Sequence, residues 1–71
     1  MKVKQLSLEQ DFENREIIVF VNCGDGRWMS ACSLSYDDCD SCPNLGNDDD
    51  YRHWLGLADD VLYSMGYEVD E

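Results

Sequence analysis

The stretch from Glu16 to Tyr36 most constrains the fold, because two strand-like runs flank an Asp-Gly pair. Residues 16–23, EIIVFVNC, are rich in β-branched side chains and predict a strand. Residues 27–36, RWMSACSLSY, predict its antiparallel neighbour. Asp25 and Gly26 between them favour the positive φ angles of a two-residue type I′ loop. The sequence therefore predicts a β-hairpin at the centre of a small sheet.

This two-residue loop sets the register of the hairpin and assigns side chains to its two faces. The predicted cross-strand pairs are Gly24–Arg27, Cys23–Trp28, Val21–Ser30, Val19–Cys32 and Ile17–Leu34. One face then collects the predicted core, namely Ile17, Val19, Val21, Cys23, Trp28, Cys32, Leu34 and Tyr36. The opposite face carries a weaker apolar set, which consists of Ile18, Phe20, Met29 and Ala31.

The rest of the chain supplies one more strand and one helix. Residues 2–8, KVKQLSL, predict a first strand, which the polar segment QDFENR connects to the hairpin. Apolar residues recur at three- and four-residue steps from about Asp49 to Met65, namely Tyr51, Trp54, Leu55, Ala58, Val61, Leu62 and Met65. Asn47 or Asp48 is the expected N-cap of this helix, and Gly66 is its expected C-terminal cap. The predicted fold is α+β, a three-stranded antiparallel β-sheet with one C-terminal α-helix packed on one face, in a single small acidic domain of residues 1–71.

The net charge of −11 is concentrated in the second half of the chain. Residues 1–35 carry four basic and five acidic side chains, whereas residues 36–71 carry Arg52 against eleven acidic side chains. This charge argues against direct binding to nucleic acid or to an anionic membrane. No apolar stretch approaches the roughly 18 residues of a membrane span, and the N-terminus lacks the apolar run of a secretory signal. We expect a cytoplasmic protein, in a bacterial host cell if a phage encodes it.

Cys39 and Cys42 have the spacing of one half of a zinc knuckle. Cys23 and Cys32 do not complete the ligand set, because the register separates them by roughly 13 Å along the sheet. The same separation excludes a disulfide between them. We therefore expect no cofactor, with a zinc site at Cys39, Cys42 and His53 as the alternative. A redox role for the CDSC segment is disfavoured, because the residues that follow it are typical of a loop and the nearby aspartates raise a thiol pKa.

Other chemistry finds little support in the sequence. The aspartates lack the alternating order of an EF-hand loop, and GDG is not followed by a phosphate-binding lysine. His53 is the only histidine, and the helical period places it on the surface beside Arg52. No nucleophile is therefore paired with a base, and we predict that the protein is not an enzyme.

The acidic residues are the remaining candidates for function. On the predicted helix, the residues that face away from the core are Asp49, Arg52, His53, Gly56, Asp59, Asp60 and Tyr63. A solvated face that confers solubility accounts for part of this charge. Yet the concentration of charge in half of so small a domain is destabilising through self-repulsion, and solubility does not require it. A binding role for the acidic surface explains the concentration better.

Small size, an expected intracellular location and localised acidity together resemble phage-encoded counter-defence proteins, including anti-CRISPR and DNA-mimic inhibitors. The resemblance is one of general character, and no motif carries it. It implies a non-enzymatic inhibitor that binds a basic nucleic-acid-handling protein or complex and blocks its access to nucleic acid. The implied contacts are Asp37, Asp38, Asp40, Asp48, Asp49, Asp50, Asp59, Asp60, Tyr36, Tyr51 and Tyr63. The alternative is a small zinc- or thiol-stabilised module that binds a partner, or a second copy as a homodimer, through the apolar sheet face.

Overall fold

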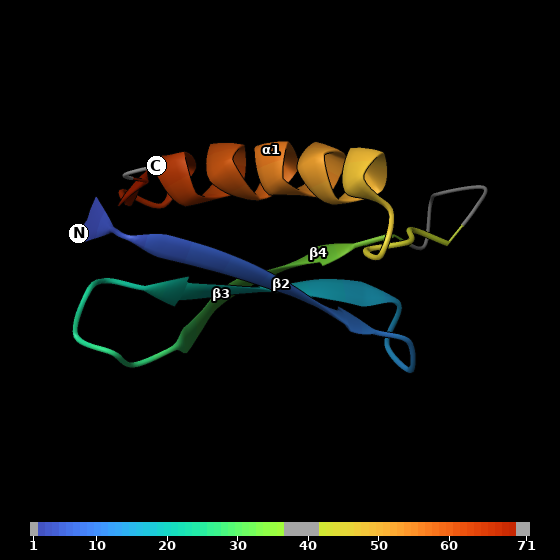
Figure 1. The fold of residues 1–71 in the computed structure, drawn as a ribbon, viewed down its shortest axis with the longest axis horizontal. Coiled ribbons are helices and arrows are strands. Elements are labelled where there is room, and N and C mark those ends of the chain that lie inside the picture. The colour runs from blue at the N-terminus through green and yellow to red at the C-terminus, as the bar shows by residue number, and fades with distance from the viewer. Residues whose placement is uncertain (1, 37–41, 70–71) are drawn as a thin grey trace.

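The computed structural model describes residues 2–36 and 42–69. Its elements in chain order are β1 (Lys2–Val3), β2 (Gln5–Asp11), β3 (Glu16–Asn22), β4 (Met29–Ser35), α1 (Asp48–Ser64) and β5 (Glu68–Val69). Strands β2, β3 and β4 form an antiparallel sheet in that order, and α1 lies across one face of it (Figure 1). This arrangement confirms the predicted α+β fold.

The core lies between the sheet and the helix. The central strand β3 contributes the side chains of Ile17, Val19 and Val21, which are completely buried. The helix contributes three buried residues spaced four apart, namely Trp54, Ala58 and Leu62, and this spacing keeps them on one side of α1. Val3, Leu8 and Tyr36 also belong to this buried hydrophobic core. Burial of a side chain as large as Ile or Leu stabilises the fold by about 1.5–3 kcal/mol.

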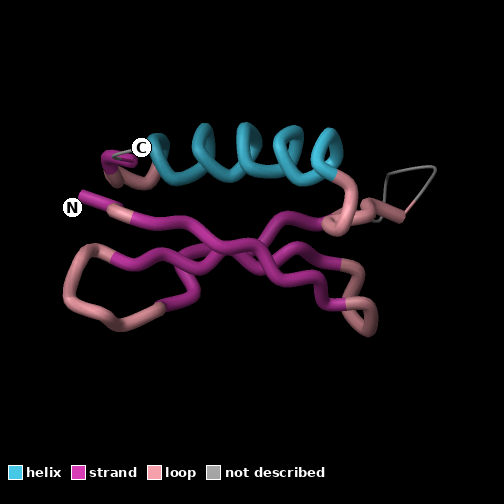
Figure 2. The backbone as a smooth tube through the Cα atoms, in the orientation of Figure 1, coloured by secondary structure: helices cyan, strands magenta, loops and turns pink. Residues whose placement is uncertain are grey.

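A second, two-stranded sheet joins the two ends of the described chain. Strand β1 runs parallel to β5 and pairs Val3 with Val69. The tube in Figure 2 accordingly returns to the N-terminal strand after it leaves the helix. The sequence predicts one continuous strand over residues 2–8 and no strand after the helix. Instead, the chain bends at Lys4, which separates β1 from β2.

The connection between β3 and β4 differs from the predicted tight hairpin. Strand β3 ends at Asn22 and β4 begins at Met29. The prediction of a two-residue loop at Asp25-Gly26 is therefore wrong. The Asn22 side chain accepts a hydrogen bond from Gly24 N at 2.8 Å, and Asp25 accepts one from Arg27 N at 3.0 Å. These local side-chain bonds satisfy backbone groups that a tight hairpin pairs across the strands. Trp28 therefore lies in a loop with 48% of its surface exposed, and its predicted place in the core is wrong.

The register of β3 against β4 is as predicted in one half and shifted in the other. The observed pairs include Ile17–Leu34, Ile18–Ser33, Val19–Cys32, Phe20–Ser30 and Val21–Met29. Ala31 is the extra residue on β4 and forms a β-bulge. The predicted pair of Val21 with Ser30 is therefore wrong. Met29 lies across from the core-facing Val21, not beside Phe20 on the opposite face.

Both ends of α1 have the predicted caps. The Asn47 side chain accepts hydrogen bonds from the backbone N–H groups of Asp49 and Asp50, at 3.0 and 3.2 Å. At the C-terminal end, Gly66 adopts a φ of 95°. Its N–H donates to Tyr63 O and the N–H of the next residue donates to Leu62 O, which is the paired bond pattern of a Schellman motif.

Candidate partner-binding surfaces

The outward helix face is the surface of α1 that points away from the sheet. It consists of the predicted residues Asp49, Arg52, His53, Gly56, Asp59, Asp60 and Tyr63, all of which are exposed. Its position follows from the helical period, because the buried side chains of α1 lie on the opposite side. Arg52, Gly56 and Asp59 border a shallow hollow of about 260 Å³ beside this face, together with Leu55.

The aspartates of the first turn of α1 contribute to the structure of the helix. Asp48, Asp49 and Asp50 lie at its N-terminal end, where the helix dipole stabilises negative charge. Asp50 is half-buried, and its carboxylate accepts a hydrogen bond from the backbone N–H of Asn44 at 3.1 Å. This bond fixes the loop that precedes the helix. The negative charges of these three predicted contact residues are therefore explained by their roles in the structure of the helix and of the loop before it.

Asp59 and Asp60 lack such an explanation. Both are exposed in the second half of α1, and the last turn of the helix contains no basic residue. Both lie beyond the first turn of α1, so the positive end of the helix dipole does not stabilise them. Neither aspartate has the position at the helix N-terminus that Asp48, Asp49 and Asp50 have. Asp59 and Asp60 are the strongest candidates among the described aspartates for contact with a partner.

The three predicted tyrosine anchors occupy different environments. Tyr63 is 79% exposed on the outward helix face, where it is available to a partner. Tyr51 is half-buried and packs against the core. Tyr36 is only 1% exposed, so its predicted role as a surface anchor is wrong. Its predicted place in the core is confirmed.

The buried ring of Tyr36 connects the end of β4 to the helix and to the β2–β3 turn. Trp54 meets it edge to face, with ring centroids 6.5 Å apart. The guanidinium carbon of Arg15 lies 5.4 Å from the centroid of the Tyr36 ring, within the range of a cation–π contact. The Tyr36 backbone N–H donates to Arg15 O at 3.1 Å. These contacts give Tyr36 a structural role.

The other predicted site residues lie around the segment before the helix. Asp37, Asp38, Cys39 and Asp40 fall outside the described residues, so their predicted roles remain predictions. Cys42 is exposed, and its sulfur accepts a hydrogen bond from the side-chain amide of Gln10 at 3.2 Å. His53 is exposed and its ring meets that of Trp54 edge to face. Within residues 2–36 and 42–69, no three His, Cys, Asp or Glu side chains are grouped to hold a metal ion.

The remaining described cysteines, Cys23 and Cys32, are half-buried free thiols. Burial raises the pKa of the Cys32 thiol above its ordinary value, because the thiolate loses hydration. The observed pairing of Cys32 with Val19 agrees with the predicted register at this position. Its raised pKa lowers the fraction of reactive thiolate at Cys32.

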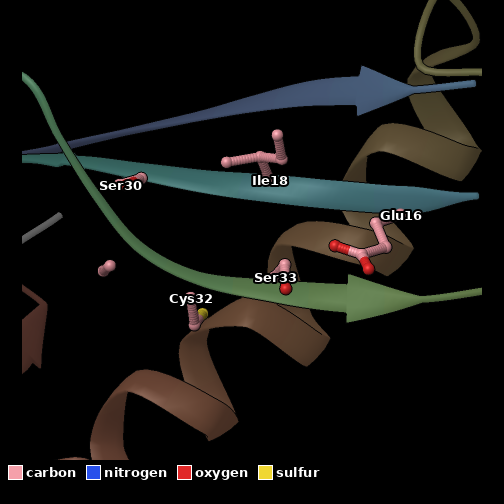
Figure 3. A pocket seen from close by; sticks show the side chains of 6 residues that line it. Glu16, Ile18, Ser30, Cys32 and Ser33 are labelled. Atoms are coloured by element: carbon pink, nitrogen blue, oxygen red, sulfur yellow. The ribbon is translucent and has the colours of Figure 1, made fainter. Parts of the chain in front are cut away.

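The open sheet face is the surface of the β2–β3–β4 sheet opposite α1. A hollow of about 340 Å³ on this face is lined by Ser7, Glu9, Phe20 and Trp28. A second hollow, of about 360 Å³, is lined by Glu16, Ile18, Ser30, Ala31, Cys32 and Ser33. Figure 3 views the second hollow with the helix behind the sheet. Sequence reasoning identified Ile18, Phe20 and Ala31 here but missed Glu9 and Trp28.

The signal for Glu9 was present in the alternation of polar and apolar residues along the first strand. Leu6 and Leu8 pair with core residues of β3, which turns Ser7 and Glu9 to the other face. The position of Trp28 had no comparable signal, because it depends on the length of the β3–β4 loop.

The comparisons of this chain with protein-family models, curated proteins and solved structures found no match. Among the described residues, no helix has the length and apolar character needed to cross a membrane.

Proposed function

We propose that this protein is a non-enzymatic inhibitor that binds a basic nucleic-acid-handling protein or complex through its acidic surface. The outward helix face then occupies a groove lined by Lys and Arg, and nucleic acid is excluded by competition. The observation that supports this proposal most strongly is the exposure of Asp59 and Asp60 near the C-terminal end of α1. Neither lies in the first turn of α1, where the helix dipole stabilises negative charge, and a basic partner gives both a role.

The dimensions of the helix are compatible with a groove that accepts a nucleic-acid strand. Asp49 and Asp60 are separated by eleven residues, or about 16 Å along the helix axis. That distance corresponds to about five phosphates of one strand in B-DNA, at about 3.4 Å each. The described acidic residues on this face are sparser than phosphates. The proposed mimicry is therefore of a charged ridge and not of each phosphate.

Tyr63 supports binding in a second way. A tyrosine with 79% of its surface exposed supplies an aromatic anchor beside the charged groups, and buried tyrosines are frequent hot spots of protein interfaces. In this account, the carboxylates accelerate association and set its salt dependence. The burial of Tyr63 slows dissociation.

The first test is affinity capture of the tagged protein from a bacterial lysate. Captured material is washed at low salt, eluted at high salt and identified by mass spectrometry. The proposal predicts release of a nucleic-acid-handling protein, and it predicts that added inhibitor displaces labelled nucleic acid from that protein. A captured protein that keeps its nucleic acid in the presence of saturating inhibitor contradicts the proposal.

The alternative function is a small zinc- or thiol-stabilised interaction module that uses the open sheet face. One observation favours this surface, namely the half-buried side chains of Ile18 and Phe20 in the middle of the sheet, beside the exposed Trp28. This alternative predicts a complex that survives high salt. It also predicts that Cys39→Ser and Cys42→Ser impair binding, whereas neutral substitutions on the outward helix face do not.

A further inference from the structure

The hollow lined by Ser7, Glu9, Phe20 and Trp28 combines two aromatic rings with one carboxylate. Ser7 pairs directly with Phe20, and Glu9 is the next residue along β2 on the same face. Trp28 completes the lining from the loop before β4. Phe20 is half-buried and Trp28 is 48% exposed, so both rings present surface to solvent. At about 340 Å³, the hollow is at the small end of ligand sites, which span about 300–1,000 Å³.

The chemistry of this lining favours a planar organic cation. Glu9 is exposed, and within the described part of the chain no hydrogen bond or ion pair engages its carboxylate. The faces of Trp and Phe rings attract cations through their quadrupoles. A guanidinium group satisfies both features, because it stacks flat on aromatic rings and donates two parallel hydrogen bonds to a carboxylate.

We propose that this hollow binds the guanidinium group of an arginine side chain on a partner protein. The group stacks on Trp28 and Phe20 and donates to the carboxylate of Glu9, and the Ser7 hydroxyl accepts a further N–H. The inference does not rest on the proposed function. The helix α1 covers one face of the sheet (Figure 1), whereas Ser7, Glu9 and Phe20 of the hollow belong to the opposite face.

Charge complementarity selects this occupant over two others. An apolar peptide segment would bury the Glu9 carboxylate without a partner, which is strongly unfavourable. A second copy of the chain would bring its own net charge of −11 against the same face, where Glu9 and Glu16 already lie. Like charges across an interface oppose association. A cationic side chain removes both penalties.

The test uses the two tryptophans of the full chain as separate reporters. The ¹⁵N-labelled protein is titrated with Nα-acetyl-argininamide, and the two indole N–H resonances are followed by NMR. Trp28 lies in the hollow, whereas Trp54 is 8% exposed on the side of α1 that faces the core. We expect saturable movement of the Trp28 resonance in the millimolar range, the affinity of a single small contact, and no movement of the Trp54 resonance.

The neutral isostere Nα-acetyl-citrullinamide distinguishes charge from shape and is expected to bind at least about fivefold more weakly. Glu9→Gln is expected to weaken argininamide binding about five- to tenfold, because it removes the charge and keeps the size of the side chain. Glu13→Gln is the matched control, since Glu13 is exposed in the β2–β3 turn outside the hollow. It is expected to leave binding unchanged.

Three results would overturn the proposal. The first is a Trp28 resonance that does not respond to argininamide. The second is the lack of a difference in either comparison. Citrullinamide then binds as tightly as argininamide, or Glu9→Gln and Glu13→Gln weaken argininamide binding equally. The third is movement of Trp28 with protein concentration alone, which would assign the hollow to a second copy. The amide spectrum of each variant shows whether it is folded, so a loss of binding is separable from a loss of structure.

Discussion

Tyr36 and Trp54 meet edge to face where the end of β4 passes beneath α1, with ring centroids 6.5 Å apart and ring planes at 72°. This contact joins Tyr36, which directly follows β4, to Trp54 in α1. Both rings belong to the buried core. An aromatic contact of this kind stabilises a fold by about 0.5–1.5 kcal/mol beyond the burial of its area.

Two substitutions of Tyr36 should distinguish how much its ring and its hydroxyl group each contribute to stability. The hydroxyl makes two long hydrogen bonds of 3.4 Å, to Gln10 and to Asp11. Tyr36→Phe is therefore expected to lower the free energy of unfolding by about 0.5–1 kcal/mol. Tyr36→Leu, which also loses the contacts with Trp54 and Arg15, is expected to cost about 1–3 kcal/mol. Urea denaturation measures both values, and an equal cost would show that the hydroxyl dominates. Tyr36→Phe should leave partner binding unchanged.

Asn47 should contribute to helix stability through its side chain. It accepts hydrogen bonds from Asp49 N and Asp50 N. Asn47→Ala is expected to lower the free energy of unfolding by about 1 kcal/mol, and Asn47→Ser by less, because serine retains a capping oxygen. Chemical denaturation of the two variants tests this order. If alanine and serine have the same effect, the cap is not the source of the stabilisation.

Gly56 and Gly66 should respond to alanine with opposite signs. A Cβ at either position meets no atom within 4 Å, so packing does not separate them. Gly66 has a φ of 95°, which alanine adopts only with strain. Gly56 lies inside α1 and carries no such requirement. Thermal unfolding should show stabilisation of about 0.5–1 kcal/mol for Gly56→Ala and a loss for Gly66→Ala. Destabilisation by Gly56→Ala would show that the helix requires glycine there.

Asp11 should make folding stability sensitive to acid. The Asn14 side chain donates to its carboxylate at 2.9 Å and, with the backbone N–H groups of the turn, lowers the pKa of Asp11 below its ordinary value of 3.8. A carboxylate whose pKa falls on folding stabilises the protein above pH 3.8, and this contribution is lost as the pH falls through the folded pKa. Asn14→Ala should raise the pKa of Asp11 towards 3.8 in an NMR titration. An unchanged value would assign the shift to the backbone bonds alone.

The sequence predicts the local elements of this fold well, for a physical reason. The β-branched run of β3 and the helical period of α1 are properties of neighbouring residues, and both elements appear within one residue of their predicted bounds. The caps at Asn47 and Gly66 are equally local. The outward helix face follows from the same period, so its residues are predictable without a structure.

The features that were not predicted have two causes. Side-chain hydrogen bonds compete with a tight turn in the β3–β4 loop, and strands pair that are far apart in the sequence. The Asp25-Gly26 pair favours a tight turn, but the side chains of Asn22 and Asp25 bond to the loop backbone and extend it. The bulge at Ala31 then shifts the register, and Trp28 leaves the core for the open sheet face. The parallel pairing of β1 with β5 joins residues at opposite ends of the chain, which no local pattern specifies.

We propose that the carboxylates of the outward helix face bind a basic partner. The most direct measurement is the salt dependence of affinity for the captured partner, with Asp59→Asn/Asp60→Asn against a control of equal charge change. Glu13→Gln/Asp25→Asn is that control, since both residues are exposed in the two turns of the sheet. We expect a weaker affinity and a shallower salt slope for the helix variant, with the control close to wild type. Equal slopes and affinities for all three proteins would contradict it.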